Sequence, residues 1–159
     1  GQVDLVQVIK AAVELTAPRL KADQIDLRWD EAAYAAPVPA WGGEVRLTQV
    51  FVNLINNAAD AMQGQSEKVI SISVESGPRL QVRVQDSGPG IKEPEKMFDP
   101  FYSTKAVGSS EGMGLGLSIS YGLVQSFGGN IRGANTGGGA VFTVELEPWR
   151  EGARKGNAA

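Results

Sequence analysis

The chain has 159 residues, of which 42% are hydrophobic, and a formal net charge of −3 at pH 7, which is ordinary composition for one globular domain with a single buried core. It contains no cysteine and no histidine, which excludes disulfides, thiolate or imidazole metal ligands, a Ser-His-Asp triad and a phosphohistidine within this chain. The slightly acidic balance and the lack of a long apolar run argue against nucleic acid and membrane as direct partners, so a soluble domain is expected.

The first part of the chain predicts a helix and two short strands. A D-x-x-Q pattern that begins at Asp4 precedes apolar residues at helical spacing. This is typical of a capped amphipathic helix, with Pro18 in its last part or at its end. Residues 25–29 alternate apolar and polar side chains, as a half-buried strand does. The two prolines within 37–39 leave room only for a short edge segment.

Residues 47–62, LTQVFVNLINNAADAM, predict a helix with an apolar back and a polar front. At about 100° per residue, Asn53, Asn57 and Asp60 share the polar face, and Asn56 lies at its margin. The predicted apolar face consists of Leu47, Val50, Leu54, Ala58 and Ala61. Asparagine is a mediocre helix former, so the asparagines cost helix stability. A solvated face is the plainer explanation for this helix alone, and a binding face is the alternative that later motifs favour.

Two alternating segments, 69–74 and 80–84, are expected to form an antiparallel hairpin, and Gly64 is expected to end the helix before them. The second strand runs into a glycine-rich loop at 86–91, DSGPGI, which cannot continue it. A phenylalanine-rich segment follows at 97–105, MFDPFYSTK.

The last third of the chain begins with GMGLGL at 112–117, which opens a predicted helix that stops at a pair of glycines. Two closing strands are expected at 131–134 and 140–146, and residues 151–159 are expected to form a polar, flexible tail. Helices and strands therefore alternate within one α/β or α+β layer pair, in a single domain that covers residues 1–150.

The glycines of the 112–117 segment suggest that the backbone binds an anion. They do not match the G-x-G-x-x-G dinucleotide fingerprint, because the third glycine comes one residue early, and the chain has neither a P-loop nor the protein-kinase signature set. A glycine-rich run at the start of a helix lets N–H groups, here those of residues 114–117, approach a phosphate closely. A plain turn with glycine caps is the alternative.

The order of these motifs is asparagine helix, D-x-G-x-G loop, F-x-P-F segment and G-x-G-x-G helix start. It resembles the catalytic and ATP-binding domain of bacterial sensor histidine kinases, within the superfamily that includes gyrase, the Hsp90 chaperone and MutL. The resemblance implies the GHKL (Bergerat) fold: an α+β sandwich with a mixed, largely antiparallel sheet of about five strands and three helices on one face. It also implies ATP and Mg2+ as ligands. The segments NNAADAM, FYSTK and GMGLGLSISYG look closest to nitrogen-regulation and C4-dicarboxylate transport sensor kinases.

The resemblance assigns a role to each motif. Asn57 is implied as the magnesium ligand through its amide oxygen, with Asn53 close to the phosphates. Asp86 is implied as the acceptor for the adenine amino group, which a carboxylate can bind, whereas guanine would present a second acceptor. The other residues implied to bind the cofactor are Asp60, Gly88, Gly90, Ile91, Phe98, Lys105, Gly112, Gly114, Leu115, Gly116 and Leu117.

Lys105 and Asp60 carry opposite charges in the implied nucleotide site. Lys105 follows Ser103 and Thr104 at the edge of the implied ATP lid, where a mobile point charge can reach the β- or γ-phosphate; a solvated lysine is the alternative. Many members of the family carry a basic residue where this chain has Asp60. Because a carboxylate repels a triphosphate, Asp60 is expected to act through water or from the adenine side.

The predicted reaction follows from Asn53, which occupies the position where the gyrase, Hsp90 and MutL relatives carry a water-activating glutamate. An amide is not a general base, so transfer is favoured over hydrolysis, with Asn53 and Lys105 as catalytic residues. The predicted acceptor is a histidine on separate dimerisation helices of the full-length protein, followed by an aspartate of a response regulator. The expected setting is the cytoplasmic part of a bacterial inner-membrane sensor. The alternatives are an anti-sigma-factor-type serine kinase, a self-contained ATPase and an ATP-binding module without catalysis.

Overall fold

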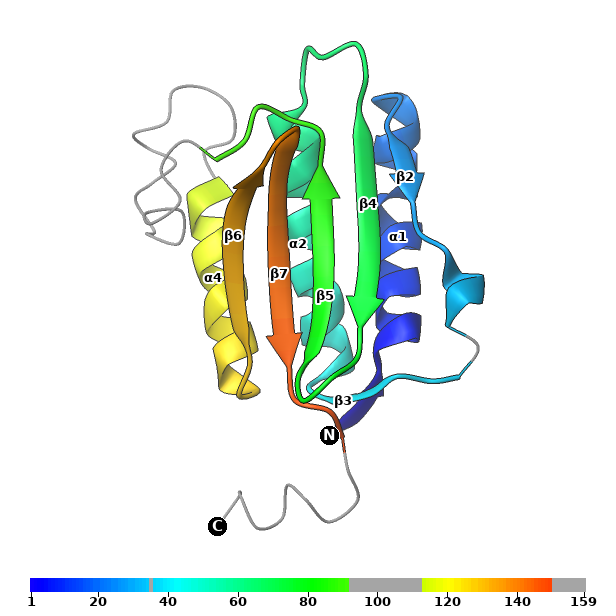
Figure 1. Cartoon of the computed structure of the whole chain (residues 1–159), viewed down its shortest axis with the longest axis vertical. Helices are drawn as coiled ribbons and strands as arrows, with labels where there is room; N and C mark the ends of the chain where they lie inside the picture. The colour runs from blue at the N-terminus through cyan, green and yellow to red at the C-terminus, as the bar shows by residue number, and fades with distance from the viewer. Residues whose placement is uncertain (35, 92–112, 150–159) are drawn as a thin grey trace.

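The structure is a computed structural model that describes residues 1–34, 36–91 and 113–149. Its centre is a five-stranded sheet of order β2-β4-β5-β7-β6 (Figure 1). The strands are β2 (Asp26–Arg28), β4 (Val69–Glu75), β5 (Leu80–Asp86), β6 (Asn130–Thr136) and β7 (Gly139–Leu146). Only β2 and β4 pair in parallel, and the other three pairings are antiparallel. The predicted mixed, largely antiparallel sheet of about five strands is confirmed.

Three α-helices cover one face of this sheet: α1 (Leu5–Ala22), α2 (Glu44–Ala61) and α4 (Met113–Ser126) (Figure 1). The predicted cap of α1 is present, because the Asp4 carboxylate accepts a hydrogen bond from the Val6 N–H at 3.0 Å. Pro18 lies inside α1 and does not end it. The three helices on one face confirm the predicted α+β sandwich. None of the described helices has the length and apolar character needed to cross a membrane.

Helix α2 lies between its two neighbours and buries a wider stripe than its sequence pattern predicts. The buried residues are Leu47, Val50, Phe51, Leu54, Ile55, Ala58 and Ala59. Ala61, which was predicted on the apolar face, is only partly buried at the last turn. The stripe widens because α2 packs against α1, α4 and the sheet together, so residues on both flanks of the predicted face are covered. Helix α2 ends at Ala61 with Met62 as its cap, so it stops slightly before the predicted Gly64, which lies in the turn that follows and has a φ of +86°.

The short segment around Val38 differs from its predicted place. It forms β3 (Pro39–Trp41), which pairs with β1 (Gln2–Asp4) in a separate two-stranded sheet and not with the edge of the main sheet. Three residues are too few to show a period in the sequence, so β1 was not predicted. A short 3-10 helix, η1 (Glu31–Ala33), completes the connection from β2.

Candidate functional site

Asp86 is the last residue of β5 and the most enclosed acidic side chain among the described residues, with 4% of its surface exposed. It lies opposite Ile70 of β4 and Ala140 of β7, so strands on both sides fix its backbone. Burial raises the pKa of its carboxyl group, and hydrogen bonds from the Gly88 and Ala140 backbone partly offset this effect. The sheet thus holds a poorly solvated carboxylate at the start of the glycine-rich loop.

The loop after Asp86 lies close against the end of α2. The Gly88 N–H donates to Asp86 Oδ1 at 2.8 Å. A Cβ at Gly88 would lie 3.0 Å from that oxygen and 3.4 Å from the Ala61 carbonyl oxygen, so a side chain would fit poorly here. The Ser87 hydroxyl lies 3.3 Å from the sulfur of Met62, which caps α2. The glycine-rich loop at 86–91 and the last turn of α2 are therefore neighbours.

Asn135 of β6 fixes the far end of the same loop. Its Oδ1 accepts from the Ile91 N–H at 2.5 Å, and its Nδ2 donates to the Ile91 carbonyl at 3.1 Å. Gly90 has a φ of +96°, and a Cβ there would lie 2.8 Å from Asn135 Oδ1. Gly90 thus supplies both the left-handed backbone and the space that the Asn135 amide needs.

Asn57 presents an unsatisfied acceptor. Its Oδ1 is buried and has no hydrogen-bond partner among residues 1–34, 36–91 and 113–149. A buried acceptor left without a donor costs about 1–3 kcal/mol, and a cation beside it would remove that cost. An amide oxygen is a hard ligand of the kind that Mg2+ prefers, so Asn57 fits the magnesium role that the family resemblance implies.

Asn53 lies one turn earlier on α2 and is held by two neighbours. Its Oδ1 accepts from Gln49 Nε2 at 2.8 Å, and its Nδ2 donates to Ser120 Oγ at 3.1 Å. Ser120 is fully buried on α4. The Asn53 amide is therefore oriented between α2 and the helix that begins with the glycine-rich motif.

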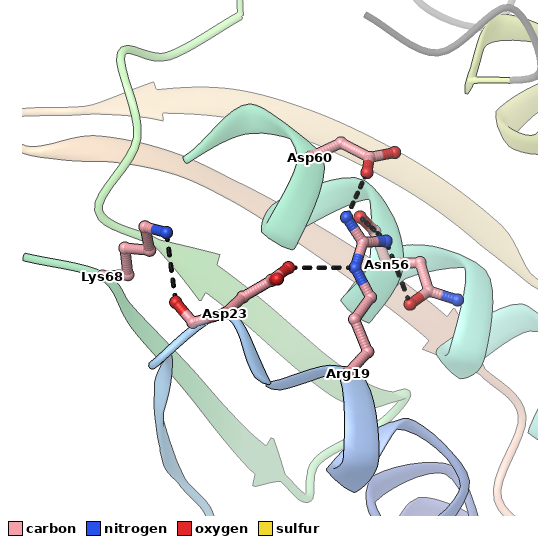
Figure 2. A network of polar contacts seen from close by, with 5 residues as sticks. All are labelled: Arg19, Asp23, Asn56, Asp60 and Lys68. Atoms are coloured by element: carbon pink, nitrogen blue, oxygen red, sulfur yellow. Dashed lines mark hydrogen bonds and ion pairs between the residues drawn. The ribbon is translucent and has the colours of Figure 1, made fainter. Parts of the chain in front are cut away.

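Asp60, one turn after Asn57, is paired with a residue that the motifs did not include. Its Oδ1 forms a short ion pair with the Arg19 guanidinium of α1 (Figure 2). Arg19 also donates to the Asn56 carbonyl and side-chain oxygens at 3.4 Å and 3.3 Å, and to Asp23 at 3.2 Å. The carboxylate that was expected to repel a triphosphate is thus partly neutralised from α1.

Residues 113–117 of the glycine-rich segment form the start of helix α4, which begins at Met113. The N–H groups without an intrahelical acceptor are therefore those of the first turn, residues 113–115, and not the whole predicted run to Leu117. The Leu117 side chain is 4% exposed and belongs to the core. Gly114, Leu115 and Gly116 contribute backbone to the first turns of α4. The predicted site residues Phe98, Lys105 and Gly112 lie outside the described residues.

Residues 42–150 match the family model for the histidine kinase-, DNA gyrase B-, and HSP90-like ATPases. The chain belongs to this ATPase family. Asn53, Asn57, Asp60 and Asp86 all lie within the matched region, whereas Arg19 lies before it. ATP is accordingly supported as the nucleotide at the level of the family.

Sensor kinases are among the relatives of this ATPase domain. It is 35% identical to the C4-dicarboxylate transport sensor protein DctS of Rhodobacter capsulatus over 95% of this chain and 23% of that protein. It is 36% identical to the sensor histidine kinase ZraS of Escherichia coli O157:H7 over 91% of this chain and 31% of that protein. The chain thus spans less than a third of the length of these curated relatives.

Solved structures of similar fold include histidine kinase domains. The catalytic domain of histidine kinase ThkA superposes with a TM-score of 0.74 at 28% identity, covering 93% of this chain and 96% of that one. ThkA in complex with the response regulator protein TrrA matches with a TM-score of 0.73 at 26% identity, over 96% of this chain and 42% of that one. The resemblance to sensor kinase ATP-binding domains is confirmed.

Three residues of the site were missed in the sequence: Arg19, Ser120 and Asn135. Each contacts a motif residue or its neighbour from a distant part of the chain, at separations of 41, 67 and 44 residues. Arg19 lies in an ordinary amphipathic helix and Asn135 in a strand without a motif, whereas Ser120 lies within the quoted GMGLGLSISYG segment, where the resemblance assigned it no role. The partner of each depends on tertiary contacts that a single sequence does not show.

Proposed function

We propose that this domain binds Mg-ATP between α2, the loop after β5 and the start of α4, and donates the γ-phosphoryl to a histidine elsewhere in a longer sensor protein. The observation that carries the proposal is the buried Oδ1 of Asn57, which has no hydrogen-bond partner among the described residues and is the atom that the family resemblance implies as a metal ligand. The nearby Asp86 carboxylate supports adenine as the base.

The residues of the site have separate roles in the proposed reaction. Asp86 accepts a hydrogen bond from the adenine amino group, while Gly88 lets the loop backbone lie close to the Asp86 carboxylate. Asn57 holds Mg2+, which when bound offsets the negative charge of the phosphates. Asn53, oriented by Gln49 and Ser120, holds the phosphate end of the nucleotide. We propose Lys105, which lies outside the described residues, as the cation that contacts the β- or γ-phosphate.

The choice between transfer and hydrolysis rests on Asn53. An amide does not take a proton from water near neutral pH, so this position gives no general base for hydrolysis. Catalysis by positioning and charge stabilisation, with a nucleophile supplied by another segment, is the reaction that these groups support. Because this chain contains no histidine, we propose that the acceptor lies on dimerisation helices of the same full-length protein.

The proposed partner of that full-length protein is a response regulator receiver domain, whose aspartate accepts the phosphoryl group from the histidine. The solved ThkA complex with the response regulator TrrA supports this partner class. ATP is a cytoplasmic metabolite, and we propose the cytoplasm as the place where this domain works.

The proposal is tested by incubating the full-length protein with Mg-ATP labelled at the γ-phosphate and recovering the labelled protein. We expect an acid-labile, base-stable phosphohistidine whose formation requires Asn57. Acid-stable phosphoserine would instead support the serine-kinase alternative. Steady release of phosphate by this domain alone would support a self-contained ATPase, and binding of ATP with neither product would support a module without catalysis.

A further inference from the structure

Arg19 connects α1 to the face of α2 that carries the proposed site. Its guanidinium contacts Asp60 and Asn56 on α2 and Asp23 just after α1 (Figure 2). Asp60 follows Asn57 by three residues, so the two side chains lie on the same side of the helix, about one turn apart. The Arg19 contact is therefore adjacent to the atom proposed to hold magnesium.

Asp60 lies between the two ends of the proposed nucleotide site. Asn57 lies one turn before Asp60 on α2. The residue after Asp60, Ala61, lies against the loop at 86–91, because its carbonyl oxygen would be only 3.4 Å from a Cβ at Gly88. The Asp60 side chain retains 20% exposure, so it is not screened as a fully exposed carboxylate would be. A carboxylate without a neutralising cation at this position would repel the phosphates of any nucleotide that spans Asn57 and the loop at 86–91.

Arg19 is the described cation that faces this carboxylate. It also pairs with Asp23 at 3.2 Å, so two carboxylates share its charge. Lys68, the other cation of the cluster, donates to the Asp23 backbone carbonyl at 3.1 Å and not to Asp60 (Figure 2). Removal of Arg19 would leave Asp60 without its guanidinium partner, within one turn of the phosphate end.

We propose that Arg19 is a positioning residue for ATP, because it neutralises Asp60 and holds the Asn56 turn of α2 in place. It acts through Asp60 and Asn56 and does not itself touch the nucleotide. This inference rests on the proposed function, since it needs a polyanion at the Asn57 face. It assigns a role to a residue that lies before the region matched by the ATPase family.

A purely structural tether between α1 and α2 makes a different prediction from charge neutralisation. If the ion pair only joins the helices, Arg19→Met and Asp60→Asn both remove it and should both weaken ATP binding. If the pair neutralises charge, the two substitutions act in opposite directions. Arg19→Met removes the positive charge beside Asp60, whereas Asp60→Asn removes the negative charge itself.

The test measures Mg-ATP affinity by titration calorimetry for the parent, Arg19→Met, Asp60→Asn and the double variant. We expect Arg19→Met to weaken binding about three- to tenfold, by an amount that shrinks as salt is added. We expect Asp60→Asn to bind at least as tightly as the parent, and the double variant to regain most of the lost affinity. Arg83→Met is the matched control, because Arg83 pairs with Glu75 and alternates with buried Val82 and Val84, so it lies on the opposite face of the sheet.

The outcomes separate the inference from the proposed function. Equal losses for Arg19→Met and Asp60→Asn, or no loss for Arg19→Met, would overturn the role of Arg19 while the parent still binds Mg-ATP. A loss in the double variant as large as in Arg19→Met would overturn it as well. If the parent itself does not bind Mg-ATP, the proposed function fails, whatever the variants do.

Discussion

Asn53 and Ser120 join the asparagine helix to the helix that follows the glycine motif, through a hydrogen bond of 3.1 Å from Asn53 Nδ2 to Ser120 Oγ. Ser120 is fully buried, so few other partners are available to its hydroxyl. This bond fixes the amide of a residue that we propose to face the phosphates. It also links α2 directly to α4.

Ser120→Ala removes this bond, and we expect a loss of about 0.5–1.5 kcal/mol in the free energy of unfolding. The measurement is chemical denaturation, compared with Ser126→Ala on the same helix. The Ser126 hydroxyl is exposed and bonds only within its own turn, so this control should change stability by less than about 0.5 kcal/mol. Equal stability of Ser120→Ala and the parent would show that the link between the helices contributes nothing.

Asp86→Asn is expected to change the pH dependence of stability and, separately, the affinity for ATP. Because burial raises the pKa of Asp86 in the folded protein, the folded state holds this proton more tightly than the unfolded chain. The contribution of Asp86 to stability is therefore present below its ordinary pKa and is lost as the pH rises through the raised folded value. The asparagine variant avoids that loss, so its stability relative to the parent should improve from acidic to neutral pH in thermal melts.

The same variant should bind ATP about ten- to a hundredfold more weakly, because a charge-assisted hydrogen bond to the adenine amino group is lost. Discrimination against GTP should fall with it. Undiminished preference for ATP over GTP would remove Asp86 from the base pocket, and a constant stability difference across the pH range would contradict its perturbed titration.

Asn135→Ala tests whether the Asn135 side chain holds the end of the loop at 86–91 in place. The variant loses both hydrogen bonds to Ile91, so we expect faster amide hydrogen exchange at Ile91. Most amides of α1 should keep their parent exchange rates, since Asn135 lies on β6 at the opposite edge of the sheet from the α1 side (Figure 1). Unchanged protection of the Ile91 amide would mean that another group holds the loop.

Most helices and strands of this fold were predictable because their apolar residues recur with a clear period along the sequence. The alternating strands and the apolar stripes of α1 and α2 are local patterns, and Asp4 and Gly64 mark helix ends through local backbone chemistry. The pairing of β1 with β3 was not predictable, because three-residue strands have no period and their pairing depends on the rest of the fold.

The residues of the site also fall into those predictable from a local motif and those that depend on the rest of the fold. Asp86, Gly88 and Gly90 were predictable from a compact motif, and the structure brings them to one loop beside α2. The Arg19 and Ser120 contacts were not, since each joins two helices through side chains far apart in the chain. The position of Leu117 in the core also depends on tertiary packing, which the glycine motif does not specify.

We propose above that Asn57 Oδ1 binds the magnesium ion that accompanies the nucleotide. Titration of ATP with and without Mg2+, for the parent and for Asn57→Ala, tests it most directly. We expect magnesium to strengthen ATP binding by the parent about tenfold or more, and to have little effect in Asn57→Ala. Without nucleotide, that variant should unfold at the same free energy as the parent or a higher one, because it removes an unsatisfied buried acceptor. Equal strengthening by magnesium in both proteins would contradict the claim.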